Sequence, residues 1–125
     1  MTYKTHFNLN ALIGTYNIDN DYEQFKRFEF VEKLGTYLDL KGAHVLELGP
    51  ASGQMTEILA SRCKQVTAVD GSSEFIEIAK QQVKESKNVE FIESYFEDFE
   101  TDKKFDLVVM HHILEHIEHP VPLLE

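Results

Sequence analysis

The sequence is poor in the features that mark secreted or membrane-embedded proteins. Cys63 is the only cysteine among the 125 residues, so no disulfide can form within the chain. No apolar run approaches the roughly 20 residues that a membrane-spanning helix needs. The first residues, Met1 to Lys4, show neither the charged start nor the apolar centre of a secretory leader. We therefore expect a cytoplasmic protein without a membrane span.

Positive charge is scarce as well, which limits the partners that the chain can bind. The sequence has 12 Lys and Arg against 22 Asp and Glu, and its formal net charge is −10. Such a surface repels phosphate backbones unless a local basic patch overrides it. The adjacent basic pairs are limited to Lys26-Arg27 and Lys103-Lys104. We therefore expect no nucleic-acid partner.

Short apolar runs alternate with helical patterns in the chain after residue 41. The strands are expected at 44–48, 65–70, 89–94 and 105–110, and the helices at 54–63 and from about 73 to 84. Strands that alternate with helices form parallel βαβ units with right-handed crossovers. At 42% hydrophobic residues, the chain can also build one modest core. The pattern thus predicts an α/β fold.

The first 41 residues are expected to form an N-terminal lid or helix, separate from the sheet domain at 42–125. Residues 1–20 have no regular period and are expected as a loop or short helix over the domain. Asp21 can cap a helix that ends at Lys41-Gly42. One apolar stripe runs along that helix: Phe25, Phe28, Val31, Leu34 and Leu38.

A glycine-containing loop joins the first predicted strand to the first predicted helix. It reads Glu47-Leu48-Gly49-Pro50-Ala51-Ser52-Gly53. Because Gly49 and Gly53 lack a Cβ, the backbone can turn sharply there and approach a ligand. A strand, a tight turn and a helix N-terminus together favour a nucleotide-type crevice, although an ordinary tight turn is the alternative. The loop lacks both the third glycine of a dinucleotide site and the lysine of a phosphate-binding loop.

Asp70 closes the second predicted strand and places an acid near that loop. An acid at this position can bind the two hydroxyls of a ribose. A ribose acceptor without a pyrophosphate cradle suits a nucleoside such as S-adenosylmethionine. Alternatively, Asp70 supports the start of the helix that follows Ser72.

Four motifs follow one another at βα spacing: Glu47-x-Gly49-x-x-x-Gly53, Asp70, Phe105-Asp106-Leu107-Val108-Val109 and Leu114-Glu115-His116-Ile117. From about Gly42 to Pro120 the chain therefore resembles class I S-adenosylmethionine-dependent methyltransferases. The most similar branch includes the ubiquinone-biosynthesis O-methyltransferases. The resemblance implies a Rossmann-like parallel sheet with flanking helices, S-adenosylmethionine as cofactor, and methyl transfer to a small-molecule substrate.

The resemblance also implies which residues bind the cofactor. Glu47 and Gly49 correspond to residues around the methionine moiety, and Asp70 corresponds to the ribose acceptor. The remaining candidates are Ala51, Gly53, Gly71, Phe96 and Met110. The sequence departs from the family at Tyr95, where an Asp that contacts the adenine amine is usual. Tyr95 or Phe96 can pack on the purine, and both can instead be core residues.

The stretch from His111 to His116 carries several alternatives for chemistry. His111 or His112 is the candidate general base for a hydroxyl substrate, and the alternative is that both only line the pocket. His112, Glu115 and His116 share one helical face and can meet a divalent ion, but we predict no metal because Leu-Glu-His also fits packing at a helix start. The inverted zinc-protease pattern H-x-x-E-H also matches here, but it follows a βαβ sheet, so we predict no peptidase.

The end of the chain suggests a partial sheet. The methyltransferase sheet has strand order 3-2-1-4-5-7-6, of which this chain would supply 3-2-1-4. The predicted fourth strand is apolar on both faces, and Pro122 begins a helix just before the last residue. We expect a truncated half of a larger methyltransferase, which would self-associate through strand four. The rival interpretations are a natural half-domain that pairs with a partner chain, a non-catalytic cofactor-binding module, and an oxidoreductase, which the two-glycine loop disfavours.

Overall fold

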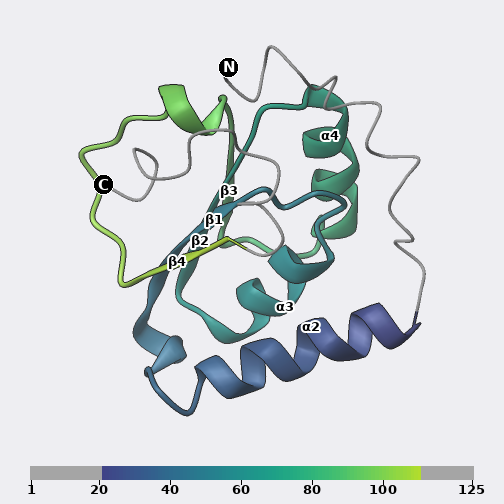
Figure 1. Cartoon of the computed structure of the whole chain (residues 1–125), viewed down its shortest axis with the longest axis vertical. Helices are drawn as coiled ribbons and strands as arrows, with labels where there is room; N and C mark the ends of the chain where they lie inside the picture. The colour runs from purple at the N-terminus through teal and green to yellow at the C-terminus, as the bar shows by residue number, and fades with distance from the viewer. Residues whose placement is uncertain (1–20, 111–125) are drawn as a thin grey trace.

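The computed structural model describes residues 21–110, and these form a four-stranded parallel sheet flanked by helices (Figure 1). The strands are β1 (His44–Leu48), β2 (Gln65–Asp70), β3 (Val89–Glu93) and β4 (Leu107–Val109). Their order in the sheet is β3-β2-β1-β4, and every neighbouring pair is parallel. The Rossmann-like α/β fold and the strand order predicted from the sequence are confirmed.

Strand β1 lies inside this sheet, which explains its nearly continuous apolar sequence. It pairs with β2 over its whole length and with β4 over three residues. Both faces of β1 are covered, since Val45 packs in one core cluster and Leu46 and Leu48 pack in another. A strand that is buried on both faces needs apolar side chains in both directions.

Strand β4 is shorter than the predicted 105–110 and lies at the edge of the described sheet. The residue before β4, Asp106, is joined to the first residue of β1, His44, by two hydrogen bonds of 2.8 Å. The Asp106 amide donates to the His44 carbonyl, and the His44 amide donates to the Asp106 carboxylate. Val108 is half exposed, so the expectation of a strand apolar on both faces holds for its sequence but not for its burial here.

Three helices cover one face of the sheet (Figure 1). They are α2 (Asp21–Leu34), α3 (Gln54–Arg62) and α4 (Ser73–Gln82). The core on this face joins the three layers: Val31 of α2, Met55, Ile58 and Leu59 of α3, and Val45 and Val66 of the sheet. None of the helices within 21–110 has the length and apolar character needed to cross a bilayer.

The prediction for the first helix was only partly right. The helix α2 ends at Leu34 rather than near Lys41, and a separate 3-10 turn, η2 (Leu40–Gly42), leads into β1. Val31 is fully buried as the apolar stripe predicts, but Phe25 and Phe28 remain more than half exposed. Val31 lies in the core shared with α3, and Leu34 packs against it, so the C-terminal half of α2 makes this contact.

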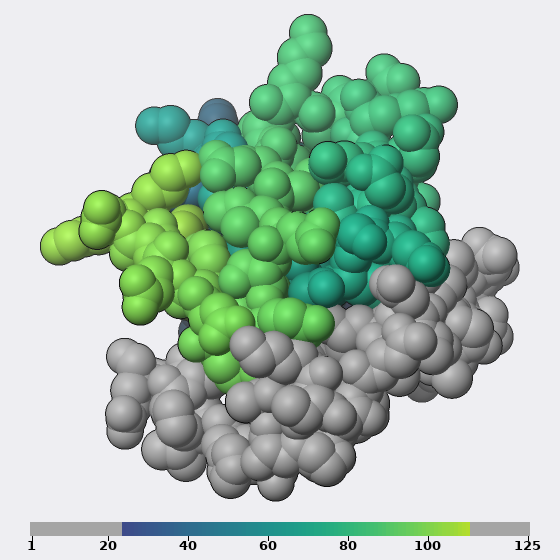
Figure 2. Space-filling view, turned by 90° about the horizontal axis from the view of Figure 1, so that it is seen from above, coloured from purple at the N-terminus to yellow at the C-terminus, as the bar shows by residue number. Residues whose placement is uncertain are grey.

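The other face of the sheet is covered in part by the connection between β3 and β4. This connection contains the 3-10 turn η3 (Phe96–Asp98), whose Phe96 packs on Leu46, Leu48 and Val69. In the view from above, this green segment lies beside the teal residues that follow β2 (Figure 2). The Ser94 amide joins the two segments by donating to the Asp70 carbonyl at 3.0 Å.

Candidate functional site

The predicted glycine loop connects the end of β1 to the start of α3 in a tight turn. Gly49, Ala51 and Gly53 have φ values of 79°, 50° and 88°, so all three adopt the left-handed conformation. The Gly49 amide donates to the Val69 carbonyl of β2 at 2.8 Å, and the Gly53 amide donates to the Pro50 carbonyl at 2.9 Å. The loop therefore lies at the carboxyl ends of β1 and β2, where open α/β sheets bind their ligands.

Gly53 is required there for two independent reasons. Its φ of 88° is a conformation that side chains with a Cβ rarely adopt. In addition, a Cβ at this position would lie 2.8 Å from the Ala79 Cα of α4. The glycine thus allows α3 to begin in close contact with α4.

Glu47 is the most unusual residue of the site, because it is a carboxylic acid buried in the middle strand. Residues alternate in direction along a strand, so Glu47 faces the same side as Val45, toward α3. There the Thr56 hydroxyl donates a 2.5 Å hydrogen bond to Glu47 Oε1. Burial raises the pKa of Glu47 to about 7; the Thr56 hydrogen bond opposes this rise, and the negative charge of Asp70 adds to it.

Asp70, at the end of β2, holds the neighbouring turns together. Its carboxylate accepts a hydrogen bond from the Ser72 amide at 2.9 Å and further backbone hydrogen bonds from Ala51 and Gly71. Burial raises the pKa of Asp70 to about 6, although these three donors act in the opposite direction. The capping of α4 itself falls to Ser72, whose hydroxyl accepts from the Phe75 amide at 3.1 Å.

The structure therefore brings most of the predicted site residues together. Asp70 contacts both Ala51 of the glycine loop and Gly71, and it acts electrostatically on Glu47. Thr56 was missed in the sequence analysis, although it follows the loop closely in the helix. Its signal was the polar character of one position within a run of buried apolar residues of α3.

The aromatic candidates lie on the other face of the sheet. Phe96 is buried in the core, and Met110 packs against the same cluster while partly exposed. Tyr95 is half-buried and precedes η3. Packing alone accounts for the ring of Phe96, so a contact with a purine stays a prediction for Tyr95 and Phe96.

The histidine stretch lies outside the described residues. This applies to His111 and His112, the candidate bases, and to Glu115 and His116, the further members of the metal alternative. Between residues 21 and 110, no group of three or more His, Cys, Asp or Glu side chains could hold a metal ion.

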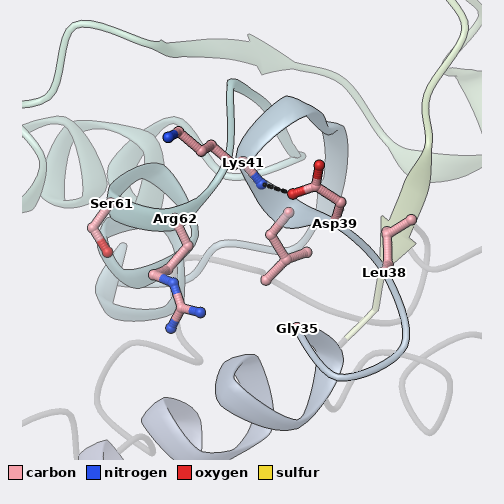
Figure 3. A pocket seen from close by; sticks show the side chains of 7 residues that line it. Gly35, Leu38, Asp39, Lys41, Ser61 and Arg62 are labelled. Atoms are coloured by element: carbon pink, nitrogen blue, oxygen red, sulfur yellow. Dashed lines mark hydrogen bonds between the residues drawn. The ribbon is translucent and has the colours of Figure 1, made fainter.

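A separate pocket of about 420 Å³ lies at the opposite ends of the strands (Figure 3). It is formed where α2, η2 and α3 meet, and its polar lining includes Asp39, Lys41, Ser61 and Arg62. The Asp39 carboxylate accepts a hydrogen bond of 3.2 Å from the Lys41 amide, and Arg62 forms an ion pair with Glu32. Because η2 leads into β1 and α3 ends before β2, this pocket is remote from the glycine loop.

Comparison with known proteins assigns the family. The model of the family described as "Methyltransferase domain" matches residues 46–125. The chain therefore belongs to the methyltransferase domain family, and the resemblance to class I S-adenosylmethionine-dependent methyltransferases is confirmed.

Two curated relatives show how much of such a protein the chain covers. Nodulation protein S of Sinorhizobium fredii is 36% identical over 75 residues, which are 60% of this chain and 35% of that protein. Ubiquinone biosynthesis O-methyltransferase of Rickettsia felis is 32% identical over 95 residues, which are 74% of this chain and 39% of that protein. The chain thus spans less than half the length of these relatives.

Solved structures share the fold. The N-methyltransferase NodS of Bradyrhizobium japonicum, in complex with S-adenosyl-L-homocysteine, has a TM-score of 0.73 and 26% identity. The similarity covers 85% of this chain and 53% of that protein. A methyltransferase from Aquifex aeolicus has a TM-score of 0.77 at 22% identity, with 91% of this chain and 62% of that protein covered, and so shows the fold alone.

Proposed function

We propose that the chain is the cofactor-binding part of an S-adenosylmethionine-dependent methyltransferase that acts on a small molecule. The observation that carries the proposal is the pair of buried acids, Glu47 and Asp70, beside a left-handed glycine loop. In a chain of the methyltransferase domain family, this arrangement offers an acceptor for hydroxyl groups and a negative charge for a cationic ligand. S-adenosylmethionine carries both features, in its ribose and in its methionine moiety.

The proposed binding mode assigns a task to each part of the site. The Asp70 carboxylate accepts hydrogen bonds from the ribose hydroxyls, and its backbone donors hold it in place for that task. Glu47 faces the methionine moiety, and Gly49 and Gly53 let the backbone approach the ligand. The cofactor supplies the electrophilic methyl group, while the protein contributes binding and alignment.

The remaining assignments of the site come from the sequence alone. Ala51, Gly71, Phe96 and Met110 complete the proposed cofactor-binding set, and His111 and His112 are the proposed bases or pocket-lining residues. We keep the boundary between an N-terminal lid or helix and the cofactor-binding unit near residue 42, supported by η2, which separates α2 from β1.

We further propose a cytoplasmic location and self-association through β4, without a nucleic-acid partner. The buried free thiol of Cys63 fits a reducing compartment. The half-exposed Val108 on the edge strand of the described sheet supports self-association, because apolar edge strands tend to pair. The net charge of −10 opposes binding to phosphate backbones.

Calorimetry with S-adenosylhomocysteine tests the proposed function. We expect the wild-type chain to bind it, and Asp70→Ala to weaken binding by about 1.5–3 kcal/mol, the typical cost of losing a charged hydrogen bond. Asp70→Asn keeps the shape of the side chain and should lose affinity as well. Asp102→Ala removes an exposed acid from the β3–β4 connection and serves as the matched control.

The outcomes separate the alternatives. Equal affinity in the wild type and Asp70→Ala would remove Asp70 from the site. Binding of NAD instead of S-adenosylhomocysteine would refute the proposal in favour of an oxidoreductase. Binding of the cofactor without methyl turnover would identify a non-catalytic module.

A further inference from the structure

The Thr56 hydroxyl is buried between α3 and the middle strand β1, close to the glycine loop in the sequence. We propose that Thr56 is a positioning residue, whose hydroxyl holds the Glu47 carboxylate in the orientation and charge in which it faces the methionine moiety of the cofactor. This inference rests on the proposed function and adds a residue to it. Thr56 would act through Glu47 and would not touch the cofactor itself.

The contact between the two side chains is short and enclosed. Thr56 is 0% exposed and Glu47 is 2% exposed, and Thr56 Oγ1 lies 2.5 Å from Glu47 Oε1. A buried threonine in a helix commonly donates its hydroxyl to a carbonyl of the preceding turn. A hydroxyl has only one proton, so the bond to Glu47 takes the place of that local bond.

Among residues 21–110, the Thr56 hydroxyl is the group that favours ionisation of Glu47. From β2, Asp70 adds negative charge, which disfavours a second carboxylate nearby. The neighbours of Glu47 in the sheet are Ala68 of β2 and Val109 of β4, and neither carries charge. From α3, the Thr56 hydroxyl donates to the carboxylate and lowers the pKa of Glu47, against the effect of burial.

The consequence concerns the pH range in which the cofactor binds. The ammonium group of the methionine moiety is attracted by the charge of Glu47 only when this carboxyl is ionised. Without the Thr56 donor, the pKa of Glu47 would rise further, and a larger fraction of the Glu47 carboxyls would be uncharged near neutral pH. The affinity, relative to that of the wild type at the same pH, would then fall at pH 7 and recover toward pH 9.

Two substitutions at position 56 test this role in the 125-residue chain. Thr56→Val keeps the shape and removes the donor, whereas Thr56→Ser keeps the donor. Carboxyl 13C NMR of the ligand-free protein measures the titration of Glu47, and calorimetry measures the affinity for S-adenosylhomocysteine from pH 6 to 9. Thr67→Val is the matched control, because Thr67 is also buried but contacts His44 at 3.2 Å, away from Glu47.

We expect Thr56→Val to raise the titration midpoint of Glu47 and to weaken binding about tenfold at pH 7, as for loss of a hydrogen bond to a charged group. The loss should shrink at pH 9. Thr56→Ser should stay within about threefold of the wild type. In the Glu47→Gln background, the substitution Thr56→Val should have little further effect, because the charge it supports is gone.

An unchanged Glu47 titration and unchanged affinity in a folded Thr56→Val variant would overturn the positioning role while leaving the proposed function intact. Equal losses in Thr56→Val and Thr67→Val would also overturn it, since both would then reflect packing. Absence of binding by the wild type at every pH would overturn the proposed function and, with it, the role of Thr56 toward the cofactor.

Discussion

The buried carboxyl of Glu47 should make the stability of the ligand-free fold depend strongly on pH. Its pKa is about 7 in the folded chain, against 4.5 for the ordinary group. Between these values the folded state binds more protons than the unfolded state, so the free energy of unfolding falls as pH rises. Each unit of pKa difference is worth about 1.4 kcal/mol, which gives about 3 kcal/mol for Glu47 between pH 4.5 and pH 7. Asp70, whose pKa is about 6 rather than 3.8, acts with the same sign at lower pH.

Glu47→Gln removes this titration and keeps the size of the side chain. We expect the variant to be more stable than the wild type by about 2–3 kcal/mol at pH 8, and within about 1 kcal/mol of it at pH 5. Urea unfolding at intervals from pH 5 to pH 8.5 measures the difference. The matched control is Glu29→Gln, which replaces an exposed carboxyl on α2.

The test is how the free energy of unfolding of the wild type and of Glu47→Gln changes with pH. Parallel curves for the wild type and Glu47→Gln would show that Glu47 titrates alike in the folded and unfolded chains, and the argument from burial would be wrong. A wild type that becomes more stable as pH rises toward 8 would reverse the sign and refute the argument more directly.

Two further substitutions test the scaffold. Gly53→Ala should destabilise the fold by about 2–4 kcal/mol in urea unfolding, because it combines a left-handed φ with a clash against Ala79, whereas Gly42→Ala, which has no atom within 4 Å of the added Cβ, should cost less than about 1 kcal/mol. Equal effects at the two glycines would contradict the geometry of the loop. Asn88→Ala should cost about 1–2 kcal/mol, since the Asn88 amide donates to the carbonyls of Ala60 at 2.9 Å and Cys63 at 3.1 Å at the end of α3. It should leave the affinity for S-adenosylhomocysteine unchanged, and a parallel loss of affinity would show that the site depends on the far end of α3.

The sequence predicts the sheet better than the helix that precedes it. The ranges of β1 and β2 match the predictions, because a buried parallel strand has a mostly apolar sequence, and here these sequences end before Gly49 and at Asp70. The extent of α2 could not be predicted in the same way. The exposure of Phe25 and Phe28 depends on tertiary packing, which the helical period of the sequence does not specify.

In the site, too, features with a local sequence signal could be predicted, whereas those that depend on long-range contacts could not. The glycines and Asp70 have local signals in the sequence, and the structure brings the loop and Asp70 into contact. Ala51 adopts a left-handed φ of 50°. Alanine rarely adopts this conformation, so its presence at position 51 gives no signal for it in the sequence. The bond between Thr56 and Glu47 joins a helix to a strand, and no sequence period links the two residues.

The order of the strands has a consequence for folding during synthesis. The hydrogen bonds between His44 and Asp106 join residues 62 positions apart, and β4 must be made before that side of β1 can pair with it. At about 5–20 residues per second, the ribosome needs roughly 3–12 s to produce this stretch. During that interval β1 lacks its neighbour on one edge, and an unpaired strand edge in a nascent chain favours aggregation.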